Sequence, residues 1–157
     1  MRIPSLGPRG EGWVLLQVVL IVLVAAAAWS LGPDWSGPLG VAGAVIGYVL
    51  LAIGLVLIFR GAVDLRGAIT PLPRPRDDAE LVETGIYGRV RHPIYTGLFL
   101  AAFGGALSQA SLMAIGLAIC LAVVLFLKSE LEEGWLVARY PGYAGYRART
   151  GRFIPRI

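Results

Sequence analysis

Residues 85–97 read GIYGRVRHPIYTG, and they place a polar, basic cluster directly before an apolar run. The cluster contains His92, the only histidine in the chain. Pro93 suits the first turn of a helix, where its missing N–H costs nothing, and it pushes His92 out of helical geometry into an extended one. We therefore expect a helix to begin here and His92 to face a pocket at a membrane boundary. Arg89 and Arg91, taken singly, are also typical of charges that flank a membrane helix.

Composition indicates a polytopic membrane protein. The 157 residues are 57% hydrophobic and 15% charged, and the mean hydropathy is +0.72. We predict an all-α bundle of about four transmembrane helices. The apolar segments are 13–31, 39–59, 94–107 and 112–127. The third segment, of about 14 residues, is shorter than the ~20 that a spanning helix needs, so we expect it to begin inside the protein.

The first apolar segment has two interpretations. A basic start before an apolar run is also typical of a signal peptide, but 13–31 is longer than a typical signal core. We therefore predict an uncleaved helix preceded by a short unstructured lead, 1–12. Two segments rich in glycine and proline, a turn at 32–38 and a linker at 70–78, separate the later elements.

The distribution of charge predicts the topology. Four spans place the N-terminus, 60–93 and 128–157 on one side, and all 14 lysines and arginines fall there. By the positive-inside rule that side is the cytoplasm, and we expect the plasma membrane of a prokaryote. The formal charge of +4 therefore fits topology, and we predict no nucleic-acid partner. Cys120 is the only cysteine, so we predict no disulfide and no metal site.

Two blocks of sequence resemble a known superfamily. Segments 81–87 (LVETGIY) and 90–97 (VRHPIYTG) resemble the cofactor motif of the isoprenylcysteine carboxyl methyltransferases and phospholipid methyltransferases. The second block is similar to their C-terminal signature and comprises Glu132, Glu133, Leu136, Tyr140, Tyr143, Tyr146 and 152–155 (RFIP). The resemblance covers about half the chain. It implies an integral-membrane methyltransferase that uses S-adenosyl-L-methionine on a hydrophobic or lipid-like acceptor.

The resemblance also implies a division of roles within one domain, 1–157. The N-terminal half, 1–80, would supply two helices and the linker, and 81–157 would bind the cofactor, capped by the C-terminal segment. The implied cofactor contacts are Glu80, Leu81, Val82, Tyr87, His92, Pro93, Ile94, Tyr95 and Glu132.

A carboxylate such as Glu132 suits the cofactor's hydroxyl or ammonium groups. Glu133 is adjacent and must point elsewhere on a helix. We predict a catalytic set of Arg91, Lys128 and Glu133, although Glu133 could instead lie on a solvated face or pair with Arg89 or Arg91.

The methyl acceptor stays open. Lys128 stands where isoprenylcysteine methyltransferases have an arginine near the substrate carboxylate, and lysine lacks the planar fork that grips a carboxylate. It could instead snorkel at the end of the fourth helix. A carboxylate acceptor needs no general base, whereas a phospholipid amine must lose a proton, for which Glu133, His92 and Tyr95 are candidates.

A different class of function is a non-catalytic scaffold or carrier that keeps the motif for folding. The predicted spans contain few polar residues beyond Gln17 and Ser30, which argues against a transporter. The sequence predicts membrane lipid as a partner and leaves the oligomeric state open.

Overall fold

A computed structural model describes residues 3–30, 37–65, 70–75 and 79–156. Apart from one isolated bridge between Val90 and Gly151, these residues form helices and loops, which confirms the all-α prediction. The elements are α1 (Glu11–Ser30), α2 (Gly37–Leu65), the 3-10 helix η2 (Gly85–Gly88), α3 (Pro93–Ser108), α4 (Leu112–Arg139) and α5 (Tyr143–Arg149). Most of the predicted turn at 32–38, and residues 76–78 of the predicted linker, lie outside the described residues.

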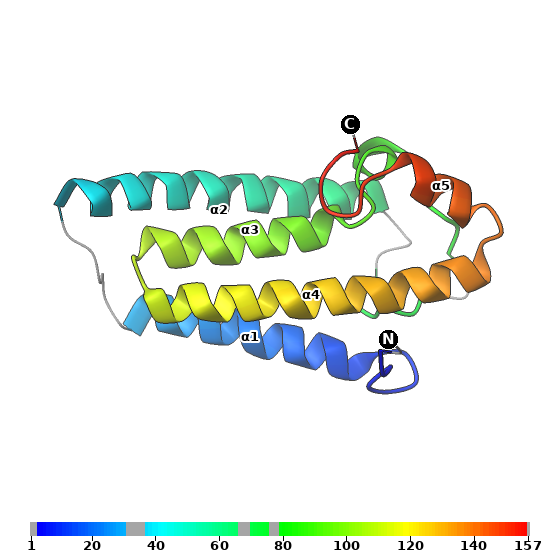
Figure 1. Cartoon of the computed structure of the whole chain (residues 1–157), viewed down its shortest axis with the longest axis horizontal. Helices are drawn as coiled ribbons and strands as arrows, with labels where there is room; N and C mark the ends of the chain where they lie inside the picture. The colour runs from blue at the N-terminus through cyan, green and yellow to red at the C-terminus, as the bar shows by residue number, and fades with distance from the viewer. Residues whose placement is uncertain (1–2, 31–36, 66–69, 76–78, 157) are drawn as a thin grey trace.

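The four long helices lie side by side and alternate in direction (Figure 1). α2 packs chiefly on α3, α1 chiefly on α4, and α3 joins the two pairs by also packing on α4. The N-terminal segment, η2, α5 and the C-terminal segment therefore meet at one end of the bundle (Figure 1). That end holds both sequence blocks.

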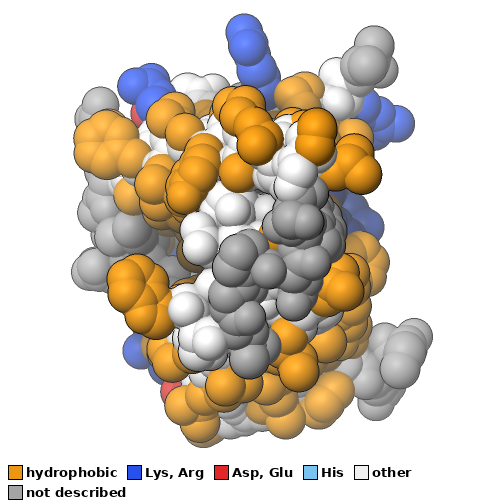
Figure 2. Space-filling model, turned by 90° about the vertical axis from the view of Figure 1, so that its left-hand side faces the viewer, with side chains coloured by type: hydrophobic (Ala, Val, Ile, Leu, Met, Phe, Trp, Pro, Cys, Tyr) orange, Lys and Arg blue, Asp and Glu red, His pale blue; other side chains and the backbone are white. Residues whose placement is uncertain are grey.

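The bundle is a polytopic membrane fold, as predicted. α1, α2 and α4 are long and apolar enough to cross a membrane, and α3 is an apolar helix of 16 residues. Large apolar side chains such as Leu15, Val22, Val56 and Phe59 are exposed along α1 and α2, which suits contact with lipid. Figure 2 looks onto the end that carries the turn between α3 and α4, where hydrophobic side chains dominate.

Glycines bring α2 and α3 into backbone contact. A Cβ atom on Gly54 would lie 2.6 Å from the carbonyl oxygen of Gly97, and one on Gly47 would lie 2.6 Å from that of Gly104. Any larger side chain would force the helices apart, a packing mode common in membranes. This contact fixes the start of α3 against the far half of α2.

η2 is docked on the end of α2. The backbone N–H of Ile86 donates to Asp64 Oδ2 at 2.8 Å. Gly85 has a φ of +61°, and a Cβ atom there would lie 2.2 Å from the same oxygen, so the position requires glycine. Pro93 then opens α3 as predicted, while His92, with φ −124° and ψ 57°, is non-helical but less extended than expected.

Several boundaries differ from the sequence prediction. α4 continues past residue 127 to Arg139, and α2 continues past residue 59 to Leu65, because polar partners stabilise the charged turns beyond each apolar run. The lead at 1–12 is also more ordered than predicted. Within its described residues, Trp13 Nε1 donates to the Pro4 carbonyl at 2.9 Å, and the Arg9 carbonyl accepts from Arg74 N–H at 3.3 Å.

Candidate functional site

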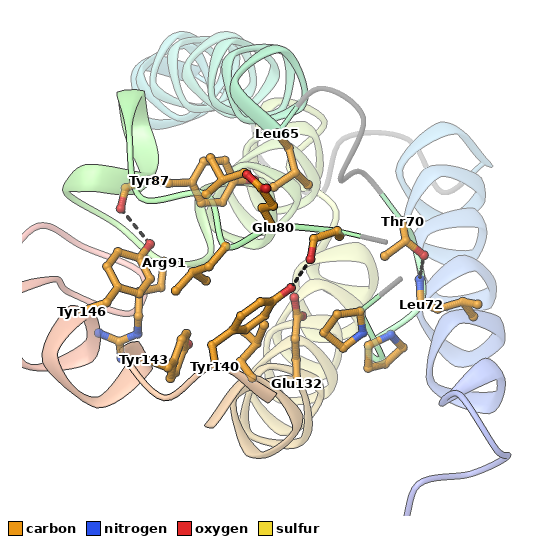
Figure 3. A pocket seen from close by; sticks show the side chains of 16 residues that line it. Leu65, Thr70, Leu72, Glu80, Tyr87, Arg91, Glu132, Tyr140, Tyr143 and Tyr146 are labelled. Atoms are coloured by element: carbon orange, nitrogen blue, oxygen red, sulfur yellow. Dashed lines mark hydrogen bonds between the residues drawn. The ribbon is translucent and has the colours of Figure 1, made fainter. Parts of the chain in front are cut away.

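Two connected cavities lie at the end of the bundle where the sequence blocks meet. The outer cavity is bounded by the 70–82 segment, η2, the last turns of α4, and α5 (Figure 3). Among its lining residues are six predicted site residues, Glu80, Leu81, Val82, Tyr87, Arg91 and Glu132. The structure thus brings together residues from both blocks around one space.

The inner cavity lies deeper, among α1, α3 and α4, and has a volume of about 290 Å³. Its lining includes the predicted His92, Ile94, Tyr95 and Lys128, together with Gln17 and Leu98. The two cavities share Leu65, Thr70, Tyr87, Arg91 and Glu132. Pro93 is buried at the start of α3 and is not among the residues that line either cavity.

Glu132 stands at the border between the cavities. Tyr95 donates its hydroxyl hydrogen to Glu132 Oε2 at 2.7 Å, and His92 Nδ1 lies 3.9 Å from the same oxygen. The Glu132 side chain is 26% exposed. Its carboxylate therefore keeps acceptor capacity that faces the space where a ligand would bind.

Glu133 is enclosed by cationic partners, at 2% exposure. Its carboxylate lies 2.8 Å from Arg91 Nε and 3.2 Å from His92 Nε2. Arg147 Nε and Arg152 Nη2 approach it at 3.3 and 3.4 Å. Of the alternatives left open by the sequence, the ion pair with Arg91 is present, and Glu133 is absent from the residues that line the two cavities.

The C-terminal segment is fastened to the motif through the backbone as well. Arg91 N–H donates to the Gly151 carbonyl at 2.9 Å, and His92 N–H to the Arg152 carbonyl at 3.0 Å. A Cβ atom on Gly151 would lie 1.7 Å from the Ile154 carbonyl oxygen, so the turn requires glycine. We call this cluster, Arg91, His92, Glu133, Arg147, Gly151 and Arg152, the clasp.

Three tyrosines near the end of α4 and on α5 also line the outer cavity, although the sequence prediction gave them no contact role (Figure 3). Tyr140 donates to the Ala79 carbonyl at 2.5 Å and Tyr146 to the Tyr87 carbonyl at 2.7 Å. The Tyr143 hydroxyl is buried, and among the described residues it has no hydrogen-bond partner. The spacing of Tyr140, Tyr143 and Tyr146, three residues apart across the Pro141–Gly142 break, was the available signal.

Burial keeps these phenols neutral. It raises the pKa of Tyr146 to about 12, against the opposing effect of the Arg91 charge. It also raises the pKa values of Tyr87 and Tyr143, and the nearby charges of Glu132 and Glu133, respectively, add to the effect. Each hydroxyl is therefore a hydrogen-bond donor at neutral pH.

Lys128 is turned into the protein rather than snorkelling, and it is 1% exposed. Its Nζ donates to Gln17 Oε1 at 2.7 Å and to the Pro71 carbonyl at 2.9 Å, and lies 5.1 Å from the centre of the Tyr95 ring. The sequence noted Gln17 only as a rare polar residue in a span. The contact joins residues 111 positions apart.

Comparison with known proteins agrees with this geometry. The family model described as phospholipid methyltransferase matches residues 42–142. The chain belongs to the phospholipid methyltransferase family. The match runs from α2 to the end of α4 and leaves α1 outside it. The superfamily resemblance is thereby confirmed, and methyl transfer is supported at the level of the family.

Two curated relatives of this family member carry names that refer to metals. The nickel-cobalt-cadmium resistance protein NccN of Alcaligenes xylosoxydans xylosoxydans is 28% identical over 146 residues, which cover 92% of this chain and 62% of NccN. The cobalt-zinc-cadmium resistance protein CzcN of Cupriavidus metallidurans is 31% identical over 83 residues, 52% of this chain and 38% of CzcN. The chain therefore spans less than two thirds of the length of these relatives.

Proposed function

We propose that the protein is an integral-membrane methyltransferase that uses S-adenosyl-L-methionine to modify a hydrophobic or lipid-like acceptor. The observation that carries the proposal is the meeting of two cavities at Glu132, one lined by the polar motif and the other reaching toward the apolar bundle. Family membership supports the reaction class. The names of NccN and CzcN refer to metal resistance and support no particular acceptor.

The residues of the outer cavity fit this cofactor. Glu80 and Glu132 offer carboxylates for ribose hydroxyl and ammonium groups, and Leu81 and Val82 give an apolar wall for an adenine ring. The buried Tyr143 hydroxyl adds an independent sign of a ligand. A buried donor left unpaired costs about 1–3 kcal/mol, and an acceptor on a bound ligand would remove that cost.

The size of the cavities indicates that a ligand occupies both. The outer cavity alone has about 90 Å³, below the ~300 Å³ at which ligand pockets usually begin. With the inner cavity of about 290 Å³, the continuous space reaches that range. Both predicted halves of the chain line it, because Leu65, Thr70 and Gln17 come from 1–80.

When bound, S-adenosyl-L-methionine supplies a methyl group already activated on a positively charged sulfur, so the protein's task is positioning and exclusion of water. Glu132, oriented by Tyr95, would balance that positive charge at the border of the cavities. The clasp would hold the C-terminal segment over the outer cavity. In this arrangement Arg91 and Glu133 position the segment, and their role in the reaction is indirect.

The acceptor would reach the site from the bilayer. An apolar groove of about 470 Å³, which we call the lateral groove, runs between α1 and the α2–α3 pair, and Leu98 lines both the groove and the inner cavity. The acceptor's nucleophilic atom would bond to the methyl carbon while the carbon–sulfur bond breaks and leaves its electron pair on sulfur. We place the cofactor entrance and both termini in the cytoplasm, on the distribution of basic residues.

Calorimetric titration of the detergent-purified protein with S-adenosylhomocysteine tests the proposal. We expect the parent to bind and Glu132→Ala to bind more weakly, with Glu11→Ala, an exposed carboxylate at the start of α1, as the matched control. Transfer of a labelled methyl group from S-adenosyl-L-methionine to a membrane lipid extract would then establish activity. A folded parent that binds no S-adenosylhomocysteine would contradict the proposal and favour the scaffold alternative.

A further inference from the structure

The inner end of the inner cavity holds a buried cation with neutral partners. Lys128 is the only lysine in a chain that otherwise uses arginine for its basic residues. Its two hydrogen-bond acceptors, Gln17 Oε1 and the Pro71 carbonyl, carry no formal charge. Across the described ranges, the structure shows no carboxylate in ion-pair contact with its Nζ. An ammonium group has three donors, so one remains for a further acceptor.

Glu132 does not serve as that acceptor in the structure. It lies one helical turn beyond Lys128, and its carboxylate accepts from Tyr95. Under the proposed function it would also face the positive charge of the cofactor. A buried charge is costly unless it is paired and hydrogen-bonded, so the surroundings of Lys128 favour an anionic ligand.

Gln17 adds a second donor at the same place. Because an ammonium group has no acceptor, Gln17 must present its amide oxygen to Lys128 Nζ, which leaves the amide NH2 as a donor for a ligand. Gln17 lines the inner cavity together with Lys128. It belongs to α1, outside the part of the chain that the family model matches.

The lateral groove continues from this polar end along the bundle. Leu98 lines both spaces, and the groove extends past Ala101 and Gly105 to Gln109. At 1.5 Å per helical residue, Leu98 to Gln109 spans about 16 Å, close to half of the ~30 Å hydrocarbon core of a bilayer. The lining between these ends is mainly aliphatic.

We infer that Lys128 and Gln17 form a binding site for the carboxylate or phosphate of an amphiphilic acceptor whose alkyl chain lies in the lateral groove. The inference rests on the proposed function for the word acceptor, and on the juxtaposition of a buried cation and an apolar groove for the chemistry. Opposite charges attract strongly where water is excluded. A cationic or uncharged head group would gain nothing from Lys128 and would leave its charge uncompensated.

The single lysine gives a direct measurement. Protein labelled with 13Cε-lysine in a non-ionic detergent has one lysine side-chain resonance. We expect it to shift saturably with laurate or dodecyl phosphate, and not with dodecyltrimethylammonium, which has the same chain and the opposite charge. Phosphatidic acid forms a further arm, because tighter binding of the two-chain lipid would identify a phospholipid, and tighter binding of laurate a single-chain acid.

Variants assign the shift to the site. Gln17→Leu should weaken anion binding about tenfold, the usual scale for a lost hydrogen bond to a charged group. Arg156→Met removes an exposed positive charge near the C-terminus and should leave the titration unchanged. Equal response to the cationic amphiphile, absence of a shift with every anion, or unchanged binding by Gln17→Leu would overturn the inference.

S-adenosylhomocysteine binding separates this inference from the proposed function. If Gln17→Leu binds S-adenosylhomocysteine like the parent, the variant is folded and its loss of anion binding is local. If the parent binds laurate but not S-adenosylhomocysteine, the methyltransferase proposal fails while the anion site stands. The reverse result would keep the cofactor site and remove the anion site.

Discussion

The clasp around Glu133 and the cavity border around Glu132 are neighbours on α4, yet their polar groups are paired to different degrees. Glu133 has cationic partners on several sides, from the motif, α5 and the C-terminal segment. Glu132 accepts one short bond from Tyr95 and remains partly exposed to the cavities. Lys128 and Tyr143, also next to the cavities, keep unused donors.

This difference separates structure from binding. A buried polar group with all its partners holds elements together, and its removal leaves those partners unpaired. A buried polar group that lacks partners destabilises the empty protein and is accounted for if a ligand supplies the partner. Changes in the clasp should therefore reduce stability first, and changes at the border should reduce binding while the fold persists.

The largest effect is expected for Glu133→Ala. It leaves Arg91 and His92 without their carboxylate, so the free energy of unfolding should fall by about 3–5 kcal/mol, and the loosened C-terminal segment should lose cofactor binding as well. Thermal unfolding followed by circular dichroism measures the change. Glu83→Ala is the control, because Glu83 pairs with the exposed Arg149 and should cost at most about 1 kcal/mol. A stable Glu133→Ala protein would show that the clasp is dispensable.

Glu132→Gln should give the opposite pattern. Glutamine keeps an acceptor for the Tyr95 hydroxyl but removes the charge, so we expect the unfolding temperature to stay near that of the parent. S-adenosylhomocysteine affinity should fall by about 1–3 kcal/mol, the scale for losing a charged hydrogen-bond partner. Calorimetry on the two proteins measures it. A variant that unfolds early and still binds normally would reverse the roles assigned to Glu132 and Glu133.

The sequence predicted the parts of this comparison that depend on local chemistry. Pro93 announced the start of α3, the apolar runs located the four long helices, and the two blocks brought the right elements to one end of the bundle. Glu132 and Glu133 could not be distinguished, because adjacent helical residues point about 100° apart and their direction depends on what packs around α4.

Other features of the site depend on contacts distant in sequence. The extension of α4 to Arg139 follows from partners supplied by the C-terminal segment, and the Gln17–Lys128 bond joins α1 to α4. The unpaired hydroxyl of Tyr143 is a property of the folded surroundings alone. No local pattern separates it from Tyr146, three residues later.

That pair offers the smallest and sharpest test. Tyr146→Phe removes a hydroxyl that donates to the Tyr87 carbonyl, so it should lower the free energy of unfolding by about 1 kcal/mol. Tyr143→Phe removes a hydroxyl without a described partner and should leave the empty protein as stable as the parent or slightly more stable. S-adenosylhomocysteine affinity should then fall about fivefold in Tyr143→Phe, since a neutral hydrogen bond contributes about 1 kcal/mol. Equal stability losses in both variants would mean that the Tyr143 hydroxyl already has a partner and is not reserved for a ligand.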